Sequence, residues 1–256
     1  MDAGKLIDLS GRIAVVTGGS RGVGRATAEM LAHAGARVAI AYRSRDEDAH
    51  DTVSAIERAG GAAWSRKGDL TDPAEVAAFF DEVEARMGRV DIVVVNHGIW
   101  PVEGVALADM SADQWRRTLG VNLDSALLVA REASRRMSDH GRLVFVGSTA
   151  GQRGEAMHAD YAASKGALIS LVKGLCVELA PRDITVNCVA PGWIDTEMAA
   201  PAFEGDARAR IEKSIPIGRV ASPDDVAGPI VFLCSELGRH VTGEILNVNG
   251  GAVLVG

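Results

Sequence analysis

The sequence has few of the residues that mark a disulfide-stapled, metal-binding or nucleic-acid-binding protein. Cysteine occurs only 3 times in 256 residues, at Cys176, Cys188 and Cys234, in apolar stretches and without the spacing of metal ligands. We therefore expect reduced, buried thiols and no metal site. Acidic residues outnumber basic ones and give a net charge of −7, which argues against the clustered positive charge of a nucleic-acid-binding surface.

Long apolar runs are also absent. No run approaches the ~18 residues that a membrane-spanning helix needs, and residues 1–10 lack the charged, apolar and small segments of a secretory signal. We expect a cytoplasmic protein that binds neither a membrane nor nucleic acid. Aromatic residues make up only 4% of the chain, but 47% hydrophobic and 24% charged residues are ordinary for a globular α/β protein.

Short apolar runs alternate with helical patterns along the chain. Near-continuous apolar runs are typical of strands buried on both faces of a parallel sheet, and their alternation with helices predicts a doubly wound fold. The predicted strands cover residues 13–16, 38–42, 62–65, 92–95, 143–146, 184–189 and 245–248. The predicted helices cover roughly residues 22–34, 46–59, 72–87, 111–138, 160–180 and 223–236. We expect one Rossmann-type α/β domain over residues 1–256, with a seven-stranded parallel sheet and helices on both of its faces.

One long segment, residues 193–214, shows no clear periodicity. It lies between the sixth predicted strand and the last predicted helix. Loops longer than about 15 residues in a compact domain are usually functional, so we expect this segment to be a lid over the substrate.

A glycine-rich turn follows the first predicted strand. Gly18, Gly22 and Gly24 stand between that strand and a helical pattern, which is the context of a phosphate-binding loop. Glycine permits the tight turn and lets the backbone approach a pyrophosphate at the helix N-terminus. The spacing G-x-x-x-G-x-G therefore predicts a dinucleotide site.

The end of the second strand indicates which dinucleotide binds. An NAD site usually carries a carboxylate about 20 residues after the glycine loop, but residues 41–45 read A-Y-R-S-R. Arg43 and Arg21 instead offer guanidinium groups that suit a 2′-phosphate. NADP(H) is therefore favoured, and NAD(H) is the alternative.

Three further residues suggest proton-transfer chemistry. Tyr161 and Lys165 are four residues apart and share one face of a predicted helix. A nearby ammonium is expected to lower the pKa of the phenol, which is ordinarily about 10, and so make Tyr161 a usable acid or base. Ser148 follows the fifth strand, at the sheet edge where ligands bind in this architecture. Its hydroxyl could hydrogen bond with a substrate carbonyl.

With the glycine loop, Ser148, Tyr161 and Lys165, the chain resembles the short-chain dehydrogenase/reductase family over essentially its whole length. The resemblance implies that Tyr161 gives or takes the proton, that Ser148 positions the carbonyl, and that Lys165 holds the nicotinamide ribose and tunes Tyr161. It also implies that Asn122 anchors a water molecule. The family's N-N-A-G element appears as V-N-H-G at residues 95–98, so Val95 and His97 depart from the pattern, and His97 could alter cofactor packing.

The same resemblance implies the set of residues that contact the cofactor. The family's loop, its Asp after the third strand, its turn after the fourth strand and its Pro-Gly after the sixth strand all have counterparts. The expected contacts are Gly18, Ser20, Arg21, Gly22, Val23, Gly24, Arg43, Asp69, Leu70, Asn96, Gly98, Tyr161, Lys165, Pro191, Gly192, Ile194 and Thr196.

The pattern is closest to the 3-oxoacyl-acyl-carrier-protein reductases, which implies a thioester substrate and an acyl-carrier protein as a candidate partner. Arg182 matches a basic residue with which those enzymes meet the carrier, but Asp139 stands where another base is expected, and an acid there weakens the carrier reading. Reduction or oxidation of a free small alcohol, sugar or ketone is the alternative, and a non-catalytic NADP-binding sensor is less favoured because the catalytic residues are intact. The family resemblance further predicts a homotetramer, with a dimer as the second choice.

Overall fold

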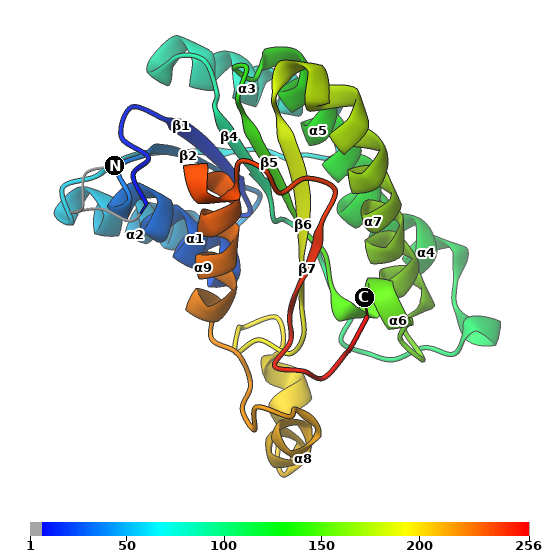
Figure 1. The fold of residues 1–256 in the computed structure, drawn as a ribbon. Coiled ribbons are helices and arrows are strands. Elements are labelled where there is room, and N and C mark those ends of the chain that lie inside the picture. The colour runs from blue at the N-terminus through cyan, green and yellow to red at the C-terminus, as the bar shows by residue number, and fades with distance from the viewer. Residues whose placement is uncertain (1–6, 256) are drawn as a thin grey trace.

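Seven parallel strands form one sheet, in the order β3-β2-β1-β4-β5-β6-β7 (Figure 1). The computed structural model describes residues 7–255. The strands are β1 (Ile13–Thr17), β2 (Arg37–Tyr42), β3 (Ala62–Lys67), β4 (Ile92–Val95), β5 (Arg142–Val146), β6 (Thr185–Pro191) and β7 (Ile245–Val248). All neighbouring pairs are parallel, and β1, β4, β5 and β6 are buried at every position. The sheet confirms the prediction made from near-continuous apolar runs.

Helices cover both faces of this sheet (Figure 1). They are α1 (Gly22–His33), α2 (Asp46–Arg58), α3 (Pro73–Met87), α4 (Ala112–Leu119), α5 (Ser125–Arg136), α6 (Thr149–Arg153), α7 (Ala159–Leu179), α8 (Ala207–Ser214) and α9 (Pro223–Cys234). One core packs α1, α2 and α9 on the sheet through residues such as Leu31 and Ile230. The other packs α3, α5 and α7 on the opposite face through residues such as Phe79 and Leu168.

The strand order reverses between β1 and β4, because β2 and β3 lie on one side of β1 while β4 to β7 lie on the other. In open α/β sheets a ligand crevice forms outside the carboxyl ends of the strands at such a switch point. The residues that follow β1, β4 and β5 therefore meet at one edge. Figure 1 shows α8 projecting beyond this same edge.

Two predicted elements differ from the structure. The single helix expected over residues 111–138 consists of α4, a π-helical turn over Gly120–Asp124 and α5. Glycine at position 120 is a weak helix former, and the wider turn leaves Asn122 fully buried, as π-helical insertions often do at functional sites. Residues 193–214 are also not a plain loop, because they contain a 3₁₀ turn (Ala200–Phe203) and α8.

Candidate active site

A cleft of about 350 Å³ opens at the carboxyl edge of the sheet, beside the switch point. It brings together the glycine loop, the ends of β2, β3, β4, β5 and β6, and the start of α7. Sixteen of the seventeen expected cofactor-binding residues line it, together with Ser148. They are Gly18, Ser20, Arg21, Gly22, Val23, Arg43, Asp69, Leu70, Asn96, Gly98, Tyr161, Lys165, Pro191, Gly192, Ile194 and Thr196.

The glycine loop has the shape that a dinucleotide pyrophosphate requires. Gly18 and Gly22 have positive φ values of 66° and 52°, which side chains other than glycine adopt only with strain. The N-terminus of α1 has no side-chain cap and no acidic residue in its first turn. Its backbone N–H groups and positive dipole end are therefore free to meet an anion, so the loop fits a bound pyrophosphate.

Gly24 is the expected cofactor residue that does not line the cleft. A Cβ atom there would lie 2.1 Å from the Gly18 carbonyl oxygen and 2.5 Å from the Asn96 amide nitrogen. Gly24 thus lets α1 pack closely on the loop rather than on the ligand. The amide of Asn96 holds the same loop, because its Nδ2 donates to the carbonyl oxygens of Thr17 and Gly18, each at 3.1 Å.

The two arginines expected at the 2′-phosphate are in different states. Arg43 is exposed, lines the cleft and forms no ion pair within residues 7–255. Arg21 instead pairs with Glu197 at 2.7 Å, and Arg45 approaches the same carboxylate at 3.4 Å. The role of Arg21 at a 2′-phosphate stays a prediction, and in the structure its guanidinium is paired with Glu197, a lid residue that carries no sequence signal.

A carboxylate does occur near the end of β2, one residue beyond the pattern that we considered. Asp46 accepts hydrogen bonds from the Tyr42 hydroxyl at 3.0 Å and from the Lys67 ammonium at 2.9 Å. Asp46 does not line the cleft. Asp69 does line it, and its Oδ1 accepts from the backbone N–H and the hydroxyl of Thr71, which lowers the pKa of that carboxyl.

Tyr161, Ser148 and Lys165 converge at the inner end of the cleft. Ser148 is the N-cap residue of α6, and its hydroxyl accepts a hydrogen bond from Ala150 N–H at 3.1 Å. The Lys165 Nζ lies 5.9 Å from the centre of the Tyr161 ring and donates to the Val146 carbonyl oxygen at 2.9 Å. This carbonyl ends β5, so the lysine ties α7 to the strand that presents Ser148.

Burial dominates the electrostatics of this group. It raises the pKa of Tyr161 to about 12, although a hydrogen bond with Ser148 opposes the rise. It lowers the pKa of Lys165 to about 8. The expectation that a nearby ammonium lowers the pKa of Tyr161 is thus wrong, because the ammonium bonds to the Val146 carbonyl and desolvation disfavours the phenolate.

Asn122 lies behind the cleft rather than on its surface. Its Oδ1 accepts from Ile99 N–H at 2.7 Å, and its Nδ2 donates to the Ile99 carbonyl at 2.9 Å and to the Ser164 hydroxyl at 3.1 Å. These bonds join the π-helical turn, the segment after β4 and α7. The water-anchoring role that the family resemblance implies remains a prediction.

His97 stands where the family pattern has alanine, and the structure gives it a definite place. Its Nδ1 lies 2.7 Å from the Thr17 hydroxyl and its Nε2 lies 2.6 Å from the Ser125 hydroxyl. Since Ser125 donates to the Val121 carbonyl at 2.5 Å, the Ser125 oxygen accepts from Nε2–H. Nδ1 then carries no hydrogen and accepts that of the Thr17 hydroxyl, whose other acceptor, the Val94 carbonyl oxygen, is farther away at 3.3 Å. Burial lowers the pKa of His97 to about 4, so a neutral imidazole connects β1 with α5 beside the cleft.

Several residues that line the cleft carried no sequence signal. Glu197 and Met198 come from the lid, and Ile99, Val121 and Ser125 come from the segments around the π-helical turn. Their residue types are not distinctive and their spacing follows no motif. Among residues 7–255, the structure shows no group of three or more side chains able to hold a metal ion. None of the helices within that range is long and apolar enough to span a bilayer.

Comparisons with known proteins agree with this geometry. The family model described as Enoyl-(Acyl carrier protein) reductase matches residues 18–253. The chain is 38% identical to the 3-oxoacyl-(acyl-carrier-protein) reductase FabG of Escherichia coli strain K12, over 97% of this chain and 100% of that protein.

Solved structures agree as well. A short-chain dehydrogenase/reductase from Serratia marcescens BCRC 10948 superposes with a TM-score of 0.90 at 36% identity, covering 95% of this chain and 98% of that one. A short-chain dehydrogenase from Burkholderia cenocepacia J2315 in complex with NADP gives 0.89 at 39% identity, covering 95% and 98%. By its fold, its cleft and these matches, the chain belongs to the short-chain dehydrogenase/reductase family, as an NAD(P)-dependent oxidoreductase acting on CH–OH groups.

Proposed function

We propose that the protein uses NADPH to reduce a ketone to a secondary alcohol, and that it runs the reverse oxidation by the same route. The observation that carries the proposal is the convergence of Tyr161, Ser148 and Lys165 in the cleft that also holds the glycine loop. A dinucleotide bound along this cleft supplies a hydride. The protein's own residues then have to orient the carbonyl and deliver one proton.

Tyr161 is the proton donor in this scheme. With a pKa of about 12, its hydroxyl is protonated at neutral pH and can donate to the carbonyl oxygen as hydride reaches the carbonyl carbon. Ser148 hydrogen bonds with the same oxygen and fixes its position, and its hydrogen bond with Tyr161 favours the phenolate that remains. One hydride and one proton add across the C=O bond, so the product is the neutral alcohol.

The choice of NADP(H) over NAD(H) rests on charge. Arg43 lines the cleft without an ion pair among the described residues, and the carboxylate of Asp46 is engaged by Tyr42 and Lys67. A 2′-phosphate would meet an unpaired guanidinium and could compete with Glu197 for Arg21. The Burkholderia cenocepacia relative, solved in complex with NADP, supports this choice, and NAD(H) remains the alternative.

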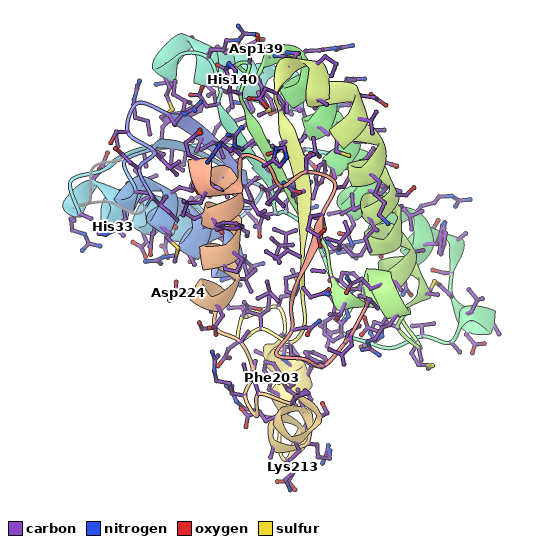
Figure 2. All side chains as sticks on the ribbon, viewed as in Figure 1. His33, Asp139, His140, Phe203, Lys213 and Asp224 are labelled. Carbon is purple, nitrogen blue, oxygen red and sulfur yellow. The ribbon has the colours of Figure 1, made fainter. Side chains whose placement is uncertain are left out.

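Two substrate classes have support. The Escherichia coli relative is a 3-oxoacyl-(acyl-carrier-protein) reductase, which favours a 3-oxoacyl thioester. A free ketone is favoured by Arg182, which pairs with Asp139 at 2.9 Å and donates to the Ser134 carbonyl at 2.6 Å. Arg182 follows α7 and precedes β6, and its partner Asp139 lies at the sheet edge opposite α8 (Figure 2). A neutralised arginine far from the cleft of its own chain gives an acidic carrier little to bind.

We further propose that residues 1–256 act as one domain, that residues 193–214 act as a lid, and that the protein is a homotetramer. Leu127 on α5 and Val177 on α7 are 50% and 72% exposed, which supports burial of these helices against a second copy. Light scattering at micromolar concentration should show four chains. A monomer would contradict the assembly.

A substrate screen tests the catalytic proposal. Initial rates of NADPH oxidation would be measured with 3-oxoacyl thioesters, free ketones, diketones and sugars, for the wild type and for Tyr161→Phe. Because proton transfer typically contributes ~10²–10⁴-fold, the variant should lose turnover by about that factor while it retains NADPH binding. If no carbonyl compound oxidises NADPH, or if Tyr161→Phe turns over at the wild-type rate, the proposal is wrong.

A further inference from the structure

Four rings gather beside the catalytic residues. Trp100 stacks on His158 with ring centres 5.0 Å apart and an angle of 16° between the planes. Trp193 meets Trp100 edge to face at 5.9 Å and meets Phe203 at 5.7 Å. We call these four residues the aromatic wall. The sequence has only 4 tryptophans and 5 phenylalanines, so the wall concentrates a side-chain type that is scarce elsewhere.

The wall comes from three segments near the catalytic residues, because Trp193 and Phe203 both belong to the lid. Trp100 lies two residues beyond Gly98, and Trp193 lies between two residues that line the cleft, Gly192 and Ile194. His158 is the N-cap residue of α7, three positions before Tyr161. None of the four rings is among the residues that line the cleft, so the wall lies beside the cleft, adjacent in sequence to residues that do line it.

The lid also contributes Phe203 to this wall. Phe203 ends the 3₁₀ turn before α8, and Figure 2 shows it between α8 and the body of the protein. Arg208 holds its guanidinium 5.3 Å from the Phe203 ring while it pairs with Asp195 at 2.8 Å. The ring is thus fixed by contacts within the lid, and closure of the lid would carry it onto a bound ligand.

The wall has one polar atom without a partner. The Nε2 of His158 is buried and makes no hydrogen bond, whereas its Nδ1 lies 3.3 Å from the Ala156 carbonyl oxygen and 3.8 Å from the Glu155 carboxylate. A buried polar atom without a partner costs free energy. Nδ1 faces oxygen atoms while Nε2, at the edge of a ring that stacks on Trp100, has no partner, so a ligand that brings its own polar group could supply one.

From these observations we propose that the substrate is an aryl ketone, with its ring held against Trp100, Trp193 and Phe203 and with a polar ring substituent hydrogen bonded to His158. The inference rests on the proposed ketone reduction and specifies its substrate. Stacked and edge-to-face contacts reward a flat, rigid ring. A flexible acyl chain gains less from such contacts and loses more conformational entropy when it is held.

A matched pair of ketones tests the ring preference. Acetophenone and cyclohexyl methyl ketone share one carbon skeleton, so the ratio of their kcat/KM values in a variant, divided by the wild-type ratio, cancels their intrinsic reactivities. Trp100→Leu should lower the preference for acetophenone about two- to tenfold, the range expected for one aromatic contact. Trp115→Leu, which changes an exposed tryptophan on α4 outside the wall, should leave the ratio unchanged. An equal loss for both ketones in Trp100→Leu would overturn the ring assignment.

A second comparison tests the polar contact of His158, with one variant that keeps an aromatic ring and one that keeps a hydrogen-bonding group. His158→Phe keeps the stack on Trp100 but lacks both nitrogen atoms, and His158→Gln restores a hydrogen-bonding group. For the hydroxyacetophenone isomer that the wild type prefers, His158→Phe should raise KM about tenfold or more, His158→Gln should recover part of the loss, and unsubstituted acetophenone should change little. An equal change of KM for both substrates would refute the polar contact.

The outcomes separate the two proposals. If the wild type oxidises NADPH with saturated ketones or 3-oxoacyl thioesters and shows no aryl preference that Trp100→Leu reduces, the aryl ketone assignment fails while the proposed reductase activity stands. If no ketone of any class oxidises NADPH, both fail. An aryl preference that depends on Trp100 supports both.

Discussion

Replacement of His97 by alanine should remove a loss of folding stability that the wild type shows at acidic pH. The imidazole is partly buried between Thr17 and Ser125, and its pKa is lowered from 6.5 to about 4. Between these two pH values the unfolded chain binds a proton that the folded chain does not bind. Stability must therefore fall as the pH falls through this window.

The magnitude follows from the same two pKa values. At about 1.4 kcal/mol per pH unit, the full loss is about 3 kcal/mol below pH 4, and about 2 kcal/mol of it is already present at pH 5. At pH 7 the contribution is close to zero. The alanine variant loses the two hydrogen bonds of the ring and is less stable at pH 7, but it has no such pH-dependent loss.

Urea unfolding at pH 7 and pH 5, at one protein concentration, measures this effect. The stability lost between the two pH values should be about 2 kcal/mol larger for the wild type than for His97→Ala, and the contributions of the other histidines cancel in the comparison. His50→Ala, an exposed histidine on α2, is the matched control and should behave like the wild type. Equal losses for the wild type and His97→Ala would show that a neutral, partly buried His97 does not describe the protein in solution.

Three further predictions concern single residues. Lys165→Met should abolish most turnover yet raise the free energy of unfolding, measured without cofactor at pH 7, by up to about 3 kcal/mol, because the lysine pKa is lowered to about 8. This gain is present below pH 8 and shrinks to nothing by about pH 10.5. Unfolding curves recorded at these two pH values measure it. Gly24→Ala should destabilise the protein, since the added Cβ would clash with the glycine loop. Gly228→Ala in α9 is the control, because its Cβ has open space around it, and it should be neutral or stabilising. Thermal melting compares the two variants, and equal melting temperatures would contradict the packing role of Gly24. Glu197→Gln should lower the KM for NADPH about two- to fivefold but not that for NADH, because it releases Arg21 from a surface ion pair; equal effects on both cofactors would be the contrary result.

Local residue patterns were sufficient for the fold class and for the order of its elements. Buried strands such as β4 and β6 have near-continuous apolar sequences because both of their faces are covered, and this property is visible in a few consecutive residues. Glycines directly after β1 indicate a tight turn because no other residue adopts their backbone angles freely. Tyr161 and Lys165 share a helix face because the α-helical repeat fixes it.

Only the tertiary structure decided the properties that depend on distant segments and on burial. His97 is held by Thr17 and Ser125, residues 80 and 28 positions away, and Glu197 reaches Arg21 over 176 positions; no local spacing specifies either contact. The pKa of Tyr161 rises because surrounding segments exclude water, and this effect outweighs the hydrogen bond with Ser148. The aromatic wall likewise assembles four rings from three separate segments. Sequence determined which chemical groups the protein carries at each strand end, because strands and turns are local. Folding determined their partners and their charge, because solvent exclusion and contact between distant segments exist only in the folded chain.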